Sequence, residues 1–292
     1  MMMLVPEAWE KHASMAEDKK AFYQYNACIM EPWDGPASIP FTDGKYIGAL
    51  LDRNGLRPSR YSVTKDGYVV MSSETGVLDI LPENIEKHGR LEPGKMFLVD
   101  MNEGRIIEDE EIKKEITTKR PYRKWLDKNL LPLKNIPYTG NKTPVEEEDF
   151  ETRMRIFGYT QEDLKTIITP MSVEGKEAIG SMGTDTPLAV LSDRPQLLYN
   201  YFKQLFAQVT NPPLDGIREE IVTDTSLSIG SDYNLFDITA DHAKKLSIQN
   251  PVISNEDLDK IKFIENDDFK SATVSTLYET QSGLNGLEQA LE

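Results

Sequence analysis

Between residues 37 and 107 the chain consists of short apolar runs separated by tight polar turns, and this spacing most constrains its fold. Short runs rich in β-branched and aromatic side chains, bounded by Asp-Gly or Glu-Gly, are typical of β-hairpins. Three such pairs follow one another: SIPFT with KYIGALLD, RYSVT with YVVMSS, and KMFLVD with RIIE. Hairpins with so little chain between them predict one antiparallel sheet.

Helical patterns flank the expected sheet. The segment from Pro6 to Glu31 is expected to hold two helical runs, the second from Asp18 to Met30, with Pro32 ending it. After the strands, residues 108–120 predict a charged helix and residues 122–129 a shorter one. Strands followed by helices in this way indicate a mixed α/β (α+β) fold.

A Pro-containing, acidic stretch without periodicity divides the chain. It predicts a linker over residues 132–148, between a first domain of residues 1–131 and a second of residues 149–292.

Helices dominate the expected second domain. Thr160 with Asp163 predicts a capping box, and Ser254 predicts a further helix start. Residues 197–209 read as an apolar helix, whereas DTPLAVLS, residues 185–192, reads as a short buried strand.

The composition limits the classes of function. The chain of 292 residues has a formal net charge of −16, so it lacks the excess of Lys and Arg that binding to nucleic-acid phosphates needs. No apolar run predicts a membrane span, and the polar N-terminus does not predict a signal peptide. The single cysteine, Cys28, excludes an internal disulfide and a cysteine-built metal site within this chain. These features favour the cytoplasm.

The segment DRNGLRPSRY, Asp52 to Tyr61, joins two of the expected hairpins. Gly55 is expected to adopt a positive φ, and Pro58 favours an extended backbone at Arg57. One interpretation is a rigid loop that presents guanidiniums to the carboxylate of an amino-acid substrate. The alternative, which composition alone favours, is a structural turn whose arginines pair with nearby carboxylates: those of Asp52, Glu74 or Asp79.

Other candidate residues carry weaker signals. Cys28 lies between apolar neighbours on an expected helix with no base indicated beside it, so a buried inert thiol is expected. The three histidines, His12, His88 and His242, are too widely spaced to predict a metal site or a triad. Trp33 is expected to be a core residue, and a role in ligand stacking is the weaker alternative.

Long sequence blocks resemble the large subunit of glutamate synthase. The later half of its type-2 glutamine amidotransferase domain resembles MMLVPEAWE, ACIMEPWDGP, DRNGLRPSRY, VVMSSETGVLDI, LEPGKMFLVD and NEGRII. The start of its central domain resembles GYTQEDLKTIITPM, GTDTPLAVLS and YFKQLFAQVTNPPLDGIREEIV. The resemblance implies a partial αββα N-terminal-nucleophile amidotransferase layer, followed by a helix-rich α/β central domain.

The resemblance also implies a reaction for the parent protein. In this family a cysteine hydrolyses glutamine, the ammonia is channelled internally, and flavin-dependent reductive amination of 2-oxoglutarate gives L-glutamate. The parent is expected to use FMN, a 3Fe-4S cluster and NAD(P)H or ferredoxin, with none of these cofactors bound by this chain. Its expected partners are the missing amidotransferase half and the flavin domain of the same polypeptide, and an electron-donating small subunit or ferredoxin.

The family's catalytic residues do not carry over to this chain. The family nucleophile is the first residue of the mature enzyme, whereas Cys28 belongs to the ACIMEP block. The oxyanion-hole Asn-Gly of the family lies in an earlier segment, so Asn54-Gly55 is not its counterpart. We therefore expect an inactive fragment with no catalytic residue. Five residues are expected to support the substrate site: Arg53, Asn54, Gly55, Arg57 and Glu74.

Two other classes of protein stay open. The chain could be a non-catalytic module that uses the same fold to bind an amino acid or a protein partner. A self-contained hydrolase that uses Cys28 is a third reading, weakened by the lack of a base. In addition, a sheet edge left open where the missing half would pair predicts concentration-dependent self-association.

Overall fold

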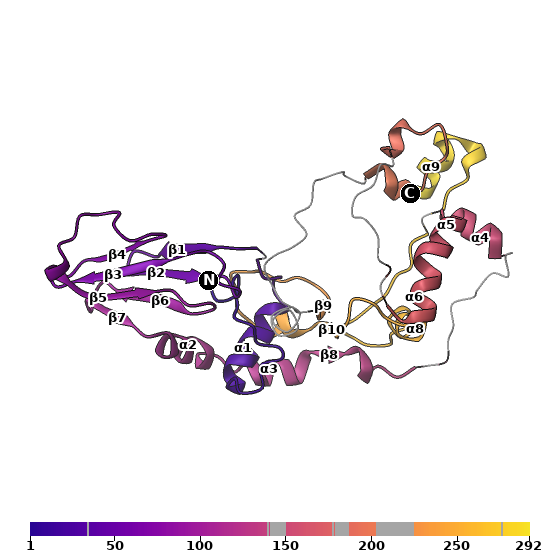
Figure 1. Cartoon of the computed structure of the whole chain (residues 1–292). Coiled ribbons are helices and arrows are strands. Elements are labelled where there is room, and N and C mark those ends of the chain that lie inside the picture. The colour runs from indigo at the N-terminus through magenta and orange to yellow at the C-terminus, as the bar shows by residue number, and fades with distance from the viewer. Residues whose placement is uncertain are drawn as a thin grey trace. The chain divides into compact units, whose positions relative to one another are not determined.

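The computed structural model describes residues 1–33, 35–138, 140, 150–176, 178, 187–202, 225–275 and 277–292. Contacts within the chain divide it into two compact units: Met1–Lys142 together with Leu214–Glu292, and Thr143–Pro213. All strands found in the described residues belong to the first unit (Figure 1).

Two antiparallel sheets form the larger part of the first unit. The first sheet has the order β1, β2, β6, β7: Ser38–Thr42, Tyr46–Leu51, Met96–Asp100 and Arg105–Ile107. The second has the order β4, β3, β5: Val69–Ser72, Arg60–Thr64 and Ile85–Arg90. The predicted hairpins are confirmed as the pairs β1–β2, β3–β4 and β6–β7.

The prediction of a single sheet is wrong. β2 pairs with β6, whereas β3 pairs with β5, a strand that the sequence pattern does not predict. The loop 52–59 separates the two sheets, because the Asp52 carboxylate binds the backbone N–H groups of Asn54 and Gly55 and turns the chain away at the end of β2. The sequence of β5, IEKHGR, lacks the apolar alternation that marks a strand.

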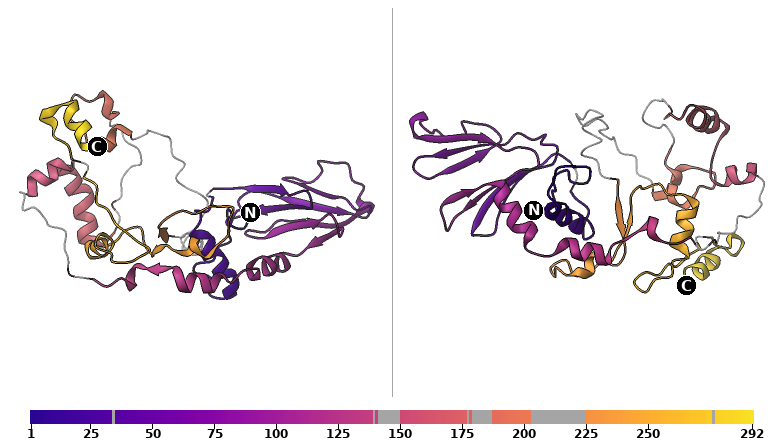
Figure 2. Two further views of the ribbon diagram at one scale, coloured as in Figure 1. Left: turned by 180° about the vertical axis from the view of Figure 1, so that it is seen from behind. Right: turned by 90° about the horizontal axis from the view of Figure 1, so that it is seen from below.

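The two sheets pack face to face over an apolar core. Tyr61 of β3 and Phe97 of β6 lie within it, with ring centroids 4.6 Å apart. Because side chains alternate along a strand, Met96 and Leu98 point to the opposite face of the first sheet. That face is covered by α2 (Asp109–Thr118) and α1 (Glu17–Ala27), and α3 (Tyr122–Asn129) packs against α1. The layers follow the order helices, sheet, sheet (Figure 2), in agreement with the expected mixed α/β fold.

The prediction of helix over most of residues 6–31 is wrong for the part before α1. α1 begins only at Glu17. Tertiary contacts hold the preceding residues in turns and override local helix propensity. Met2 and Val5 are buried, and the Glu7 side chain faces a group of buried charges.

This charge group ties the N-terminal segment to α2 and to the turn before β6. The Lys113 ammonium, on a side chain only 3% exposed, lies 3.1 Å from Glu7 Oε1 and 2.9 Å from Asp109 Oδ2. It also donates a hydrogen bond to the Gly94 carbonyl at 2.7 Å. The Tyr23 hydroxyl donates to Glu7 Oε1 at 2.9 Å. One buried cation therefore joins three segments of the chain.

The pKa of Glu7 predicts a loss of stability in acid. Burial alone would raise this pKa, but the ion pair and hydrogen bond with Lys113, the hydrogen bond from Tyr23 and the charge of Lys19 outweigh burial and lower it. Such a carboxyl stabilises the fold above its unfolded pKa, near 4.5, and this contribution is lost as the pH falls through the lowered value. In urea titrations between about pH 5 and 3, the unfolding free energy of the wild type should fall more steeply than that of Glu7→Gln. An equal pH dependence of the unfolding free energy in the two proteins would contradict a lowered pKa for Glu7.

A small third sheet joins segments far apart in the sequence. β10 (Leu246–Ile248) pairs in parallel with β8 (Leu131–Pro132) and antiparallel with β9 (Leu227–Ile229). Ile136, just after β8, is buried in a cluster with β10. The first residues of the linker expected at 132–148 thus pack into the first unit. Most of its later residues lie outside the described residues, and the domain boundaries stay a prediction.

The residues before β10 pack against α1 and α3. Tyr25 of α1 is 0% exposed, and its hydroxyl donates to the Thr239 carbonyl at 2.6 Å. Its ring lies edge-on to His242, with centroids 6.2 Å apart, and tilted against Trp125 of α3 at 5.4 Å. The Asn129 side chain donates to the Ala240 carbonyl at 3.3 Å. The aromatic side chain of Tyr25 thus lies at the centre of this contact.

The second unit contains short helices over the predicted helical stretch: α4 (Phe150–Ile156), α5 (Gln161–Asp163) and α6 (Thr169–Glu174), with a π-helical turn Leu164–Ile168 before α6. The capping box is confirmed. Thr160 Oγ1 accepts from the Asp163 N–H at 3.1 Å, and Asp163 Oδ2 accepts from the Thr160 N–H at 2.8 Å.

The strand predicted at residues 185–192 is wrong in its described part. Ala189–Leu191 form a 3₁₀ turn in which Val190 is 71% exposed, and no strand of the described residues pairs with it. Of the helix predicted at residues 197–209, Leu198–Phe202 are 3₁₀-helical and the residues after 202 lie outside the described residues.

Two helices follow β10. α8 (Asn255–Lys262) confirms the predicted cap, because Ser254 Oγ accepts from the Asp257 N–H at 3.1 Å. α9 (Leu284–Leu291) lies near the end of the chain.

Candidate functional site

The loop between β2 and β3 is fixed by its own first residue. The Asp52 side chain is buried, and its Oδ2 accepts from the N–H groups of Asn54 at 2.9 Å and Gly55 at 3.0 Å. Its Oδ1 accepts from the N–H of Ala37 at 3.1 Å. Backbone donors therefore satisfy this buried carboxylate. The structural-turn hypothesis pairs the arginines of the loop with Asp52, Glu74 or Asp79, but the described part of the chain shows no ion pair between these groups.

Gly55 holds the loop against the turn before β6. Its φ is +63°, a left-handed conformation that favours glycine, and a Cβ placed there would lie 2.4 Å from Pro93 Cγ. The N–H of Leu91 donates to the Ser59 carbonyl at 3.0 Å. The loop and the turn thus form one rigid corner.

Replacing Gly55 with alanine should destabilise the protein by roughly 1–3 kcal/mol, because the Cβ adds a clash to a strained φ. Gly44→Ala is the matched control, since Gly44 has a φ of +88° but no atom within 4 Å of the added Cβ. Urea unfolding should give a larger loss for Gly55→Ala. Equal losses would mean that the contact with Pro93 contributes nothing.

An open pocket of about 350 Å³ lies where this loop meets the end of β5. We call it the arginine groove, because residues 54–60 and 90–93 line it with the side chains of Arg57, Arg60 and Arg90. Arg60 and Arg90 are direct partners in the β3–β5 pair, so their side chains lie on one face of the sheet.

The structure brings together some of the predicted site residues. Asn54, Gly55 and Arg57 all line the arginine groove. Arg53, half-buried, lines a separate small pocket with Asn54. Glu74 is exposed in the loop after β4, outside both pockets, where its carbonyl accepts a hydrogen bond from a serine hydroxyl. The supporting role of these five residues stays a prediction.

Two observations differ from the sequence reasoning. Trp33 lines the small pocket beside Arg53 and is 55% exposed, so the prediction of a core residue is wrong. The sequence pattern does not indicate Arg90 as a site residue, because Arg90 lies on β5, the unpredicted strand. The only signal for it would be the register that places it opposite Arg60.

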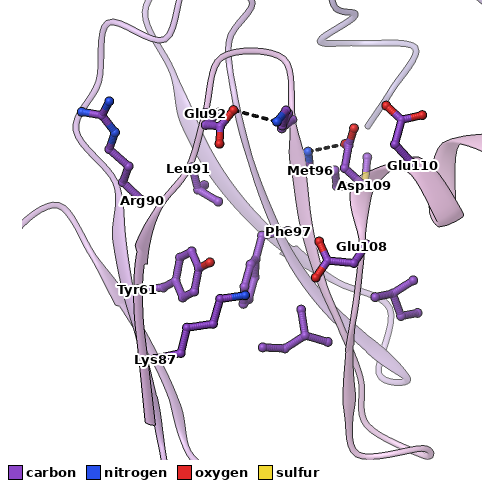
Figure 3. Close-up of a pocket in the computed structure, with 13 residues that line it drawn as sticks. Tyr61, Lys87, Arg90, Leu91, Glu92, Met96, Phe97, Glu108, Asp109 and Glu110 are labelled. Atoms are coloured by element: carbon purple, nitrogen blue, oxygen red, sulfur yellow. Dashed lines mark hydrogen bonds and ion pairs between the residues drawn. The ribbon is translucent and has the colours of Figure 1, made fainter. Parts of the chain in front are cut away.

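A second open pocket, of about 220 Å³, lies between the two sheets and shares Arg90 with the arginine groove (Figure 3). Its walls carry opposite charges, with Lys87 on β5 facing Glu108 before α2. Asp109 in the same wall is already engaged, because its carboxylate accepts from the Met96 N–H at 2.7 Å and pairs with Lys113. The charges of this pocket are therefore largely balanced within the protein.

Comparison with known proteins identifies both halves of the chain. Residues 1–125 match the family of class-II glutamine amidotransferases, and residues 152–292 match the glutamate synthase central domain. The chain is 51% identical over 280 residues to the large chain of NADPH glutamate synthase from Bacillus subtilis (strain 168). The chain belongs to the glutamate synthase large-subunit family.

Other glutamate synthases match over the whole chain. The NADH glutamate synthase of Schizosaccharomyces pombe (strain 972 / ATCC 24843) is 42% identical, and ferredoxin-dependent glutamate synthase 2 of Synechocystis sp. (strain ATCC 27184 / PCC 6803 / Kazusa) is 41% identical. The B. subtilis match covers 95% of this chain. The chain spans only 18%, 14% and 19% of the B. subtilis, S. pombe and Synechocystis proteins, respectively.

Cys28, the single thiol of this glutamate synthase chain, is buried at the contact between α1 and β9. Its Sγ donates to the Gln24 carbonyl at 3.3 Å and lies 3.7 Å from Ser228 Oγ. Burial raises the pKa of the thiol, which the hydrogen bond with Ser228 and the charge of Lys245 only partly oppose. A protonated, enclosed thiol is a poor nucleophile.

The described residues include no group of three or more His, Cys, Asp and Glu side chains arranged to hold a metal ion. Within the same residues, every helix is too short or too polar to cross a bilayer.

Proposed function

We propose that the chain is part of a glutamate synthase large subunit whose whole polypeptide makes L-glutamate from glutamine and 2-oxoglutarate. The observation that carries this proposal is the succession of two domain matches in one chain, an amidotransferase followed by a glutamate synthase central domain. In the whole protein, glutamine hydrolysis releases ammonia, which is channelled to a second site for reductive amination. The two sheets and the helix layer supply one side of the glutaminase, and the rigid loop 52–59 braces its active-site region.

We further propose that this chain alone does not hydrolyse glutamine. A thiol nucleophile needs exposure and a lowered pKa, whereas Cys28 is buried and its pKa is raised. The catalytic cysteine would come from a segment of the polypeptide outside this chain, as would the flavin domain.

The iron–sulfur cluster expected for the parent does not fit the residues of this chain. A 3Fe-4S cluster is held by several cysteine thiolates, and the chain has one cysteine. We place the cluster and FMN in other segments of the polypeptide. The names of the relatives include NADPH, NADH and ferredoxin. The electron donor of the parent is therefore one of two kinds: NAD(P)H, acting through a small subunit, or ferredoxin. We propose a cytoplasmic location, which the single cysteine of this chain supports because it leaves no internal disulfide here.

An exchange experiment tests the proposed function. This chain would replace the matching segment of the B. subtilis protein, and glutamate formation from glutamine and 2-oxoglutarate would be measured. The proposal predicts activity within about tenfold of the unexchanged protein. At 51% identity the exchanged segment should keep its own core packing and its contacts with the rest of the polypeptide. A folded exchange protein, by circular dichroism and gel filtration, that forms no glutamate would contradict it.

The open edges of the second sheet lead to a separate proposal on assembly. β4 and β5 are its outer strands, and Leu78 and Leu81 in the loop between them are 59% and 65% exposed. We propose that the chain self-associates as its concentration rises, because unpaired edges and apolar loops favour association. A constant monomer mass in light scattering over a hundredfold concentration range would contradict this.

A further inference from the structure

The arginine groove concentrates positive charge on a strongly acidic protein. The chain has 49 Asp and Glu against 33 Lys and Arg, yet Arg57, Arg60 and Arg90 share one pocket. The pocket also contains Glu92, whose carboxylate pairs with Lys95 at 2.7 Å and also interacts electrostatically with Arg90. Among the described residues, no ion pair joins a carboxylate to any of the three guanidiniums. The three positive charges exceed the single carboxylate in the lining, and a bound anion would relieve the repulsion between the guanidiniums.

The backbone that carries the three arginines is fixed before any ligand arrives. The buried Asp52 carboxylate fixes the loop that carries Arg57, and Gly55 seats that loop against Pro93. Arg60 and Arg90 lie on paired strands. Fixed positions reduce the entropy lost when a ligand binds.

Part of the remaining lining is apolar, alongside the polar Asn54 and Ser59, and this apolar part indicates the kind of anion. Besides the charged residues, the lining includes five hydrophobic or proline residues: Leu51, Leu56, Pro58, Leu91 and Pro93. Guanidiniums pair with carboxylates through two parallel hydrogen bonds, and an apolar surface suits a hydrocarbon spacer between two such groups. The groove volume of about 350 Å³ is within the range of small-ligand sites.

We propose that the arginine groove binds a small organic dicarboxylate, with its carboxylates on the guanidiniums and its carbon chain on the apolar lining. Arg60 and Arg90, from adjacent strands, hold one carboxylate, and Arg57 holds the other. The proposal concerns ligand binding in this groove and does not depend on the glutaminase reaction proposed above.

Isothermal titration of the 292-residue chain with glutarate tests the proposal. We expect saturable binding at one site, weakened about tenfold or more by Arg60→Ala and by Arg90→Ala, because each removes a charge-assisted hydrogen-bonded pair. Arg155→Ala is the matched control, since its side chain is 81% exposed on α4 and does not line the groove; it should leave binding unchanged. Thermal unfolding of each variant checks that the fold persists. Arg60→Lys should bind with intermediate affinity, because lysine keeps the positive charge but cannot make the two parallel hydrogen bonds of a guanidinium.

Two further titrations test the class of ligand. Butyrate, which has one carboxylate, and inorganic phosphate, which has no carbon spacer, should each bind about tenfold more weakly than glutarate or worse. Phosphate or butyrate binding as tight as glutarate binding would overturn the dicarboxylate assignment. The absence of saturable glutarate binding, or unchanged binding in Arg60→Ala and Arg90→Ala, would overturn the site itself.

Discussion

Replacing Lys113 with methionine should destabilise the protein by about 3–5 kcal/mol, because the change leaves the Glu7 and Asp109 carboxylates without their shared cation. The Lys113 side chain is 3% exposed and contacts both carboxylates as well as the Gly94 carbonyl. Methionine keeps most of the side-chain volume, so the loss of stability reflects the removed charge more than altered packing. Urea-induced unfolding at neutral pH measures the change.

Lys95→Met is the control for this substitution. Lys95 also pairs with a carboxylate, but the Lys95 and Glu92 side chains are 55% and 58% exposed, so its loss should be below about 1 kcal/mol. A second comparison uses acid, where protonation of Glu7 should narrow the gap between wild type and Lys113→Met. Similar losses in the two lysine variants would show that the buried charge group does not stabilise the fold.

Tyr25→Ala should lower the free energy of unfolding by about 3–5 kcal/mol, because it opens a cavity at the centre of the contact between α1, α3 and the residues before β10. Tyr25 is fully buried, and its ring contacts Tyr122, Trp125 and His242. Tyr25→Phe keeps the ring but removes the hydrogen bond to the Thr239 carbonyl, so its loss should be nearer 1–3 kcal/mol.

Hydrogen exchange gives this second prediction a local readout. Amide protection over residues 225–248 should fall in Tyr25→Ala by more than it falls in the strands of the first sheet. Tyr68→Ala is the matched control, since Tyr68 is 67% exposed and its removal should change stability by less than about 0.5 kcal/mol. Unchanged protection over residues 225–248 in Tyr25→Ala would contradict the role given to this contact.

Local patterns predicted those elements whose signals lie within a few residues. The hairpins follow from apolar runs joined by Asp-Gly and Glu-Gly turns, and the boundaries of α3 follow from helical periodicity. The capping box at Thr160 and the cap at Ser254 rest on contacts three residues apart. Each of these features forms from its own segment.

Features that depend on distant contacts were not predictable in this way. The division into two sheets depends on β3 pairing with β5, whose sequence IEKHGR has no strand pattern of its own. The residues before α1 have helical propensity, but the burial of Met2 and Val5 and the ion pair of Glu7 with Lys113 hold them in turns. The motif around Asp52 indicated a guanidinium-bearing loop, and Arg57 does line a groove. Arg90 joins that groove only through sheet register, which no local pattern specifies.

The measurement that most directly tests the central claim is ammonia release from glutamine by the purified 292-residue chain, with circular dichroism to verify that it is folded. The claim is that the chain carries part of a glutamate synthase amidotransferase but not its nucleophile. It predicts a folded protein that releases no ammonia above background, and the same result for Cys28→Ala. Sustained glutamine turnover by the wild-type chain would contradict the claim, and its loss in Cys28→Ala would identify the buried thiol as the nucleophile.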